Sequence, residues 1–316
     1  MDIREYIDGK TKQAIFDNKK ICILGHGAFG TAIETLLVGK GYNPIIWEKD
    51  KDIEACVKGC DFLIFAVPAQ AFREVLTKAA PYIESAIIVN LAKGIEIDSM
   101  KRLSEVAEEV APGCKYVALS GPSHAEEVQL KLPTNICAAS KDANLSKEVQ
   151  DLLFTKFFRV YTNSDLIGVE IGGAIKNVIA LACGIAEGLG FGDNAKAALI
   201  TRGLAEISRL GEKLGADKSS FFGLSGVGDL IVTCDSMHSR NRRCGILLGK
   251  GTSVKEACTM VGQTVEGITT CVAAHELSEK LNVDMPITNF MYQFLNGEIS
   301  LFEATDMLLS RSSQEE

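Results

Sequence analysis

The first half of the chain alternates between two hydrophobic patterns. Short apolar runs that are typical of strands occur at residues 20–24, 44–47, 61–67, 86–91, 116–120, 135–139 and 158–161. The runs at 61–67 and 86–91 are typical of strands buried on both faces. Between these runs, apolar residues recur at helical spacing over residues 28–38, 72–80, 99–110 and 145–154. Strands that alternate with helices in this way predict an α/β fold, with a Rossmann-like, doubly wound and mostly parallel sheet covered on both faces.

After about residue 163 the hydrophobic pattern is helical throughout. Helical periods extend over residues 165–189, 194–214, 230–234, 253–260, 267–281, 287–296 and 300–310. This part of the sequence therefore predicts an all-helical C-terminal domain. We divide the chain into an N-terminal extension (1–18), a Rossmann-like domain (19–164) and a helical domain (165–316).

The first helix of the second half carries a single lysine, Lys176, among apolar and small residues. Burying an ammonium group without a partner is costly, so Lys176 either has a task or extends its charged end from a buried helix to water. Glycines are unusually frequent around it, although glycine weakens a helix interior. We expect a cofactor and a substrate to approach this backbone closely.

Composition and charge narrow the possible partners. The net charge of −8 argues against a nucleic acid or an acidic membrane as partner, and no apolar run reaches the roughly 18 residues of a membrane span. The charged start of the chain does not resemble a secretory signal. Ten cysteines spread singly through the sequence favour reduced thiols in a cytoplasmic protein, and the four histidines do not form a metal-binding pattern.

A glycine motif directly follows the first predicted strand. Gly25, Gly27 and Gly30 form G-x-G-x-x-G between a strand and a helix, the context in which this motif binds the pyrophosphate of a dinucleotide. The alternative is a purely structural glycine turn. After the second strand, Glu48 could bind the ribose hydroxyl of NAD, whereas Lys49 could contact the 2′-phosphate of NADP, so the cofactor preference stays open.

Two further groups of residues suggest a reaction site. Lys93 follows the fourth strand, at the edge where open sheets of this kind bind ligands, unless it is an exposed loop lysine. Residues 239–243, SRNRR, place three arginines in a loop of an otherwise acidic chain. Arginine forks match phosphate oxygens, so this loop is a site for a phosphorylated group, a solvated basic loop or a set of salt bridges.

Nine sequence blocks together resemble a known family. They are GHGAFGTA (25–32), AVPAQAFREVL (66–76), AKG (92–94), SGPSHAEEV (120–128), GVEIGGAIKNV (168–178), GLGFGDNAKAALITRGLAE (188–206), GLSGVGDLIVTC (223–234), SRNRR (239–243) and VEG (265–267). From residue 20 to about 309 the chain resembles the bacterial type of NAD(P)-dependent glycerol-3-phosphate dehydrogenase. The resemblance implies the reversible reduction of dihydroxyacetone phosphate to sn-glycerol 3-phosphate, which supplies glycerophospholipid synthesis.

The resemblance also implies roles for individual residues. It makes Lys176 the general acid and base, Lys93 a second active-site lysine, and Asp229 a residue that orients Lys176 or a substrate hydroxyl. It implies substrate contacts at Lys93, Gly121, Ser123, Lys176, Asp229, Ser239, Arg240 and Asn241. It implies cofactor contacts at Gly25, Gly27, Ala28, Phe29, Gly30, Lys49, Lys93, Ala125, Arg240, Thr264 and Glu266.

Some positions differ from the form most common in the family. His124 replaces a usual phenylalanine, and Ala28, Ala92, Glu187, Ser225 and Thr264 also differ, but no proposed catalytic group is lost. Two other functions remain possible: a reductase of another small ketone or 3-hydroxy acid, and a non-enzymatic sensor of nicotinamide nucleotides. Apolar helical segments at residues 272–281 and 290–295 could form a homodimer face or only a core.

Overall fold

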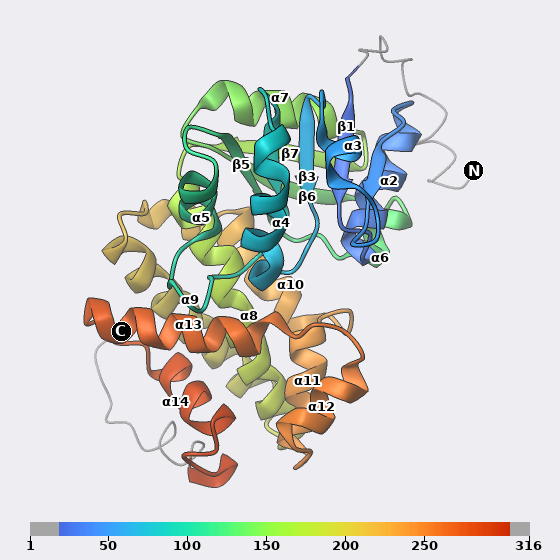
Figure 1. Cartoon of the computed structure of the whole chain (residues 1–316). Coiled ribbons are helices and arrows are strands. Elements are labelled where there is room, and N and C mark those ends of the chain that lie inside the picture. Colours follow the sequence, from blue (N-terminus) through green and yellow to red (C-terminus); the bar gives the residue numbers. More distant parts are fainter. Residues whose placement is uncertain (1–18, 304–316) are drawn as a thin grey trace.

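The computed structural model describes residues 19–303, so the predicted N-terminal extension and most of the predicted helix 300–310 lie outside the described residues. A seven-stranded sheet forms the first half, with its strands in the order β2-β1-β3-β4-β5-β6-β7 (Figure 1). Its strands are β1 (Ile21–Leu24), β2 (Ile45–Trp47), β3 (Phe62–Phe65), β4 (Ile87–Asn90), β5 (Lys115–Ser120), β6 (Thr134–Ala139) and β7 (Phe158–Asn163). Neighbouring strands are parallel except β5 and β6, which are antiparallel. The predicted fold is confirmed.

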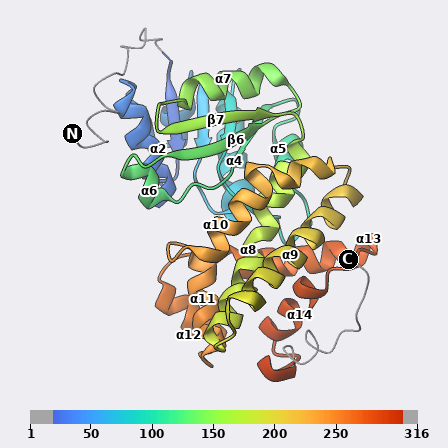
Figure 2. The same cartoon turned by 180° about the vertical axis from the view of Figure 1, so that it is seen from behind.

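Helices cover both faces of this sheet. The helices α3 (Ile53–Val57), α4 (Phe72–Ala79) and α5 (Leu103–Val110) pack on one face. The helices α2 (Ala28–Gly39), α6 (Ala125–Gln129) and α7 (Ala143–Leu153) pack on the other, which Figure 2 shows from behind. β1, β3 and β4 are buried along their whole length, and their sequences are apolar except at Asn90, the last residue of β4.

The second half is helical in the part that the structure describes. Its helices are α8 (Leu166–Gly188), α9 (Asp193–Lys213), α10 (Asp229–Asp235), α11 (Arg240–Gly249), α12 (Val254–Val261), α13 (Glu266–Leu281) and α14 (Pro286–Leu295). Helix α8 is long and apolar enough to cross a membrane, but 89% of its most apolar window is buried inside the protein. It is therefore the core helix around which the others pack (Figure 2).

Glycines line the contact between α8 and α11. A Cβ atom on Gly184 would lie 2.2 Å from the carbonyl oxygen of Arg242, and one on Gly245 would lie 2.2 Å from that of Leu181. Gly188 and Gly249 continue the same contact one turn further along. The expectation that ligands require the glycines of α8 is therefore wrong at Gly184 and Gly188, where the backbone of another helix occupies that space.

The structure corrects several other predicted elements. Helix α5 starts at Leu103 and not at residue 99, because Met100 is in the left-handed region (φ 58°) and Ile95 forms a bridge with Arg102. The short helices α3 and α6 were not predicted. The stretch 239–243, which we expected to be a loop, forms the start of α11, with Ser239 as its N-cap.

Candidate active site

A cavity of about 440 Å³ lies between the carboxyl edge of the sheet and helices α8, α10 and α11. Its walls come from the turns after β1, β3, β4 and β5, from α8, and from the segments that precede α11 and α13. Among the predicted site residues, those lining it are Gly27, Ala28, Phe29, Lys93, Ser123, Ala125, Lys176, Ser239, Arg240, Asn241, Thr264 and Glu266. The topology therefore brings both predicted lysines and the predicted anion site to one cavity.

The glycine turn after β1 leaves one end of this cavity open. Gly25 has a φ of +102°, and a Cβ atom there would lie 2.8 Å from the carbonyl oxygen of Ala66. A Cβ atom on Gly30 would lie 2.3 Å from the carbonyl oxygen of Gly25, so the helix packs tightly on the turn. Gly27 is exposed with free space beside it, and no side chain caps the N-terminus of α2. These features fit a pyrophosphate at the helix N-terminus.

Glu48 and Lys49 lie just beyond this end of the cavity. The turn is tied to β2, because the N–H of Gly25 donates to the carbonyl oxygen of Trp47 at 3.0 Å. Glu48 is exposed and forms an ion pair with Lys51 at 3.4 Å, and neither Glu48 nor Lys49 lines the cavity. The geometry therefore does not decide between NAD and NADP.

At the other end, one carboxylate binds two lysines. Lys176 Nζ donates to Asp229 Oδ1 at 2.5 Å, and Lys93 Nζ donates to Asp229 Oδ2 at 2.8 Å. Lys176 also donates to Thr233 Oγ1 at 2.7 Å, and Lys93 to the carbonyl oxygen of Gly121 at 2.9 Å. The side chain of Lys176 is 6% exposed and that of Asp229 is 2% exposed. Lys176 thus has buried partners and does not extend to water.

Burial and charge together set the protonation of this cluster. Burial, assisted by the positive charge of Lys93, lowers the pKa of Lys176 to about 8, although Asp229 acts in the opposite direction. Burial alone would raise the pKa of Asp229, but the two lysines hold it below its usual value. The result is an ionised carboxylate beside an ammonium group that can release its proton near neutral pH.

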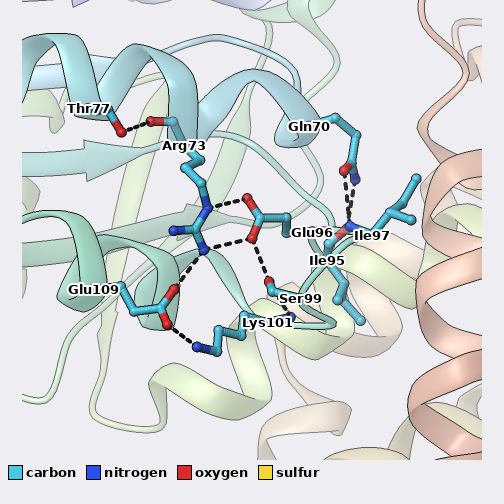
Figure 3. Close-up of polar contacts among 9 residues, drawn as sticks. All are labelled: Gln70, Arg73, Thr77, Ile95, Glu96, Ile97, Ser99, Lys101 and Glu109. Carbon is cyan, nitrogen blue, oxygen red and sulfur yellow. Dashed lines mark hydrogen bonds and ion pairs between the residues drawn. The ribbon is translucent and has the colours of Figure 1, made fainter.

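The segment after Lys93 is held by side chains from the sheet part (Figure 3). Gln70 donates to the carbonyl oxygen of Ile95 at 2.8 Å. Arg73 donates two hydrogen bonds of 2.8 Å to Glu96 and a third, of 2.7 Å, to Glu109 on α5. This ion-pair network fixes the loop that carries Lys93.

A second, buried chain of hydrogen bonds holds the residue before Lys93. Asn90 accepts the N–H of Ala92 at 3.1 Å, and its amide nitrogen donates to the Tyr116 hydroxyl at 2.9 Å. The Tyr116 hydroxyl donates to Glu170 of α8 at 3.1 Å. The strand end that carries Lys93 is therefore linked to the helix that carries Lys176.

The predicted anion site is only partly free. Arg242 donates two hydrogen bonds of 2.9 Å to the Glu187 carboxylate and one of 2.7 Å to the carbonyl oxygen of Asp235. Of the three arginines in residues 239–243, Arg240 lines the cavity and Arg242 and Arg243 do not; for Arg242 the salt-bridge alternative holds. Arg240 donates a long hydrogen bond, of 3.4 Å, to the carbonyl oxygen of Thr264.

Asn241 is held in place by its neighbours. Its amide donates to Asn177 Oδ1 at 3.0 Å and its oxygen accepts the N–H of Gly267 at 2.8 Å, which leaves one amide hydrogen free. Gly121, with a φ of +144°, directs its carbonyl oxygen to Lys93, while Ser123 lines the cavity.

Sequence reasoning missed two residues of this site. Asn177 and Thr233 line the cavity and bond to predicted site residues. Both lie inside sequence blocks that we recognised, next to Lys176 and one helical turn after Asp229. Their positions relative to Lys176 and Asp229 were the sequence feature that could have identified them. Within residues 19–303 the structure contains no group of three or more metal-ligating side chains.

An open glycine turn at one end of a cavity and paired lysines at the other define a nicotinamide-dependent dehydrogenase built from a sheet and a helical part. Two family models support this class: NAD-dependent glycerol-3-phosphate dehydrogenase N-terminus matches residues 48–146, and the corresponding C-terminus matches residues 165–306. The chain belongs to this family.

Individual relatives agree with this assignment. Glycerol-3-phosphate dehydrogenase of Clostridium acetobutylicum, described as using NAD(P)+, is 48% identical over 310 residues, which cover 88% of this chain and 93% of the relative. The Bacillus subtilis enzyme of the same description is 47% identical over 331 residues, covering 94% and 96%. The crystal structure of glycerol-3-phosphate dehydrogenase from Coxiella burnetii is 35% identical, has a TM-score of 0.89 and covers 93% of this chain and 99% of its own.

Proposed function

We propose that this protein interconverts dihydroxyacetone phosphate and sn-glycerol 3-phosphate with NAD or NADP, and so supplies glycerophospholipid synthesis in the cytoplasm. The observation that carries this proposal is the pair of lysines, Lys93 and Lys176, that the buried carboxylate of Asp229 holds in the cavity that Arg240 also lines. Family membership supports the same reaction. A homodimer through residues 272–281 and 290–295 stays a prediction.

The nucleotide end fits the cofactor. Gly25, Gly27 and Gly30 allow its pyrophosphate to approach the main chain, with Ala28, Phe29, Ala125, Thr264 and Glu266 along the walls. When bound, the nicotinamide ring supplies or accepts the hydride. The protein positions the carbonyl carbon beside this ring and controls the proton.

Lys176 is the proton donor and acceptor in this proposal. In reduction, its ammonium group gives a proton to the substrate oxygen as negative charge develops there, and in oxidation its amine takes that proton back. A pKa of about 8 makes both forms accessible near neutral pH. Thr233 and Asp229 fix the Nζ atom, so it does not have to be oriented during the reaction.

Lys93 and Asp229 have supporting roles. Lys93 places a second positive charge beside the reacting oxygen, which stabilises the developing alkoxide. Asp229 keeps both lysines in place and offsets the repulsion between them. Arg240, with Ser239 and Asn241 at the start of α11, holds the phosphate and fixes the distance of the carbonyl group from Lys176.

The direct test is the oxidation of NADH, and in parallel of NADPH, with dihydroxyacetone phosphate as substrate. Turnover with this substrate supports the proposal, and the two cofactors give the preference. Absence of turnover with both would refute it and favour a sensor or a reductase of another ketone. Lys176→Ala should keep cofactor binding, measured by nucleotide fluorescence, and lose turnover by a factor of ~10² or more. Near-normal turnover would rule out Lys176 as the acid.

A further inference from the structure

His124 lies at the lysine end of the cavity and is not used in the steps above. It immediately precedes α6, and its side chain lines the cavity together with those of Lys176 and Thr233. Its main chain is fixed, because its carbonyl oxygen accepts the N–H groups of Glu127 and Val128 at 3.1 Å each. The imidazole therefore has a defined position beside the reacting groups.

One nitrogen of this ring lacks a partner. Nε2 of His124 is buried and forms no hydrogen bond. Burial, together with the charge of Lys176, lowers the pKa of the ring, so the imidazole is neutral at neutral pH. The backbone of Val232 acts in the opposite direction on this pKa. In the tautomer that has the single N–H of the neutral imidazole on Nδ1, Nε2 carries a lone pair.

The neighbouring acceptors at this end are already engaged. Both oxygens of Asp229 accept hydrogen bonds from lysines. The hydroxyl of Thr233 accepts from Lys176 and donates to the carbonyl oxygen of Asp229 at 2.6 Å. Nε2 of His124 is thus an acceptor available to a ligand hydroxyl, and leaving it unpaired is unfavourable.

We propose that His124 is a specificity-determining residue whose Nε2 accepts a hydrogen bond from the free hydroxyl of the three-carbon substrate. This inference rests on the proposed function, in which Arg240 holds the phosphate and Lys176 the carbonyl oxygen. The exposed ring of His238 lies beside His124, at a centroid distance of 5.7 Å.

The test compares two ketone phosphates that differ only in this hydroxyl. Hydroxyacetone phosphate carries a methyl group where dihydroxyacetone phosphate carries CH2OH, so it cannot donate to His124. The measured quantity is the ratio of kcat/KM for dihydroxyacetone phosphate to that for hydroxyacetone phosphate, at one fixed cofactor concentration. Because both assays use the same enzyme sample, partial unfolding of a variant cancels in this ratio.

Two variants separate the ring nitrogens. The amide of Gln places a polar atom near the position of Nε2, whereas the shorter Asn reaches only the position of Nδ1. His124→Asn should lower the ratio about tenfold, and His124→Gln should keep it within about threefold of the wild-type value. His275→Phe is the matched control, because His275 stacks on Tyr292 and lies outside the cavity.

The outcomes are distinct. An unchanged ratio in His124→Asn would overturn the inference, as would equal losses for both ketones with a raised KM for NADH, which would place His124 against the cofactor. If the wild-type enzyme reduces neither ketone, the proposed function fails before His124 is tested. A drop in the ratio confined to His124→Asn would support the inference.

Discussion

Replacing Asp229 by asparagine tests the electrostatic design of the active site. The substitution keeps the shape of the side chain but removes the charge that lies 2.5 Å from Lys176 Nζ and 2.8 Å from Lys93 Nζ. At an effective dielectric constant of about 20, a charge pair at this separation is worth roughly 6 kcal/mol. Asparagine retains a hydrogen bond to Lys176, so we take the net loss of attraction as a third of this value, about 2 kcal/mol. A loss of that size corresponds to a fall of about 1.5 units in the pKa of Lys176.

The assay is the pH dependence of kcat/KM for dihydroxyacetone phosphate reduction. The acid must be protonated, so wild-type activity should fall as pH rises through about 8. In Asp229→Asn this limb should move to about pH 6.5, and this shift alone should reduce the activity at pH 7 about fourfold. The free energy of unfolding should also fall, by about 3–5 kcal/mol, because two buried lysines lose their counter-ion.

Asp235→Asn is the control for this experiment. Asp235 lies on the same helix, α10, but is exposed and pairs with Lys196 at 2.9 Å. It should leave the pH profile unchanged. If the profile of Asp229→Asn also stays near pH 8, the carboxylate does not set the proton affinity of Lys176 and the reasoning is refuted.

Three further predictions follow from the contacts described above. Arg240→Ala should lower kcat/KM for dihydroxyacetone phosphate by about 10–100-fold and lower that for free dihydroxyacetone far less. Arg242→Ala, the control, should lower the melting temperature without changing the preference for the phosphorylated substrate. Equal losses of kcat/KM for both substrates in Arg240→Ala would contradict the role of Arg240 in binding the phosphate. Gly245→Ala should destabilise the protein by about 1–3 kcal/mol in thermal unfolding, because the added methyl group would meet the carbonyl oxygen of Leu181. Gly39→Ala is the control: the space beside Gly39 is free, so this substitution should be neutral or slightly stabilising. Burial raises the pKa of Glu206 from 4.5 to about 7, so the folded state favours the neutral form of this side chain. Relative to Glu206→Gln, the free energy of unfolding of the wild-type protein should therefore decrease by about 3 kcal/mol between pH 4.5 and 7. If the free energy of unfolding depends on pH in the same way in both proteins, this effect is excluded.

The sequence predicted the elements that depend on local pattern. All seven strands were found to within two residues, and those buried along their whole length, such as β1 and β3, leave continuous apolar runs. The start of α11 was missed because its first turn, with Arg240, Asn241 and Arg242, consists of polar side chains whose partners come from elsewhere in the fold. The sequence also could not predict that β6 runs antiparallel to β5, since the hydrophobic pattern of a strand does not indicate the direction in which it pairs.

Residues of the candidate site were predicted, together with one of their pairs, Asp229 with Lys176, which came from the resemblance and not from the hydrophobic pattern. The second partner of Lys176, Thr233, is 57 positions away and was not predicted. Such contacts follow from helix packing, which hydrophobic periodicity does not specify. For the same reason the sequence could not show that Arg242 pairs with Glu187, which lies on a different helix.

The close contact between α8 and α11 fixes the spacing between the two residues proposed to bind the two ends of the substrate. The glycines at Gly184 and Gly245 place backbone against backbone, so neither helix can slide along the other without a clash. Lys176 is carried by one of these helices and Arg240 begins the other. The distance between the proposed proton donor and the proposed phosphate site therefore depends on main-chain packing, so we expect a ketone phosphate with a longer carbon chain to be a poorer substrate.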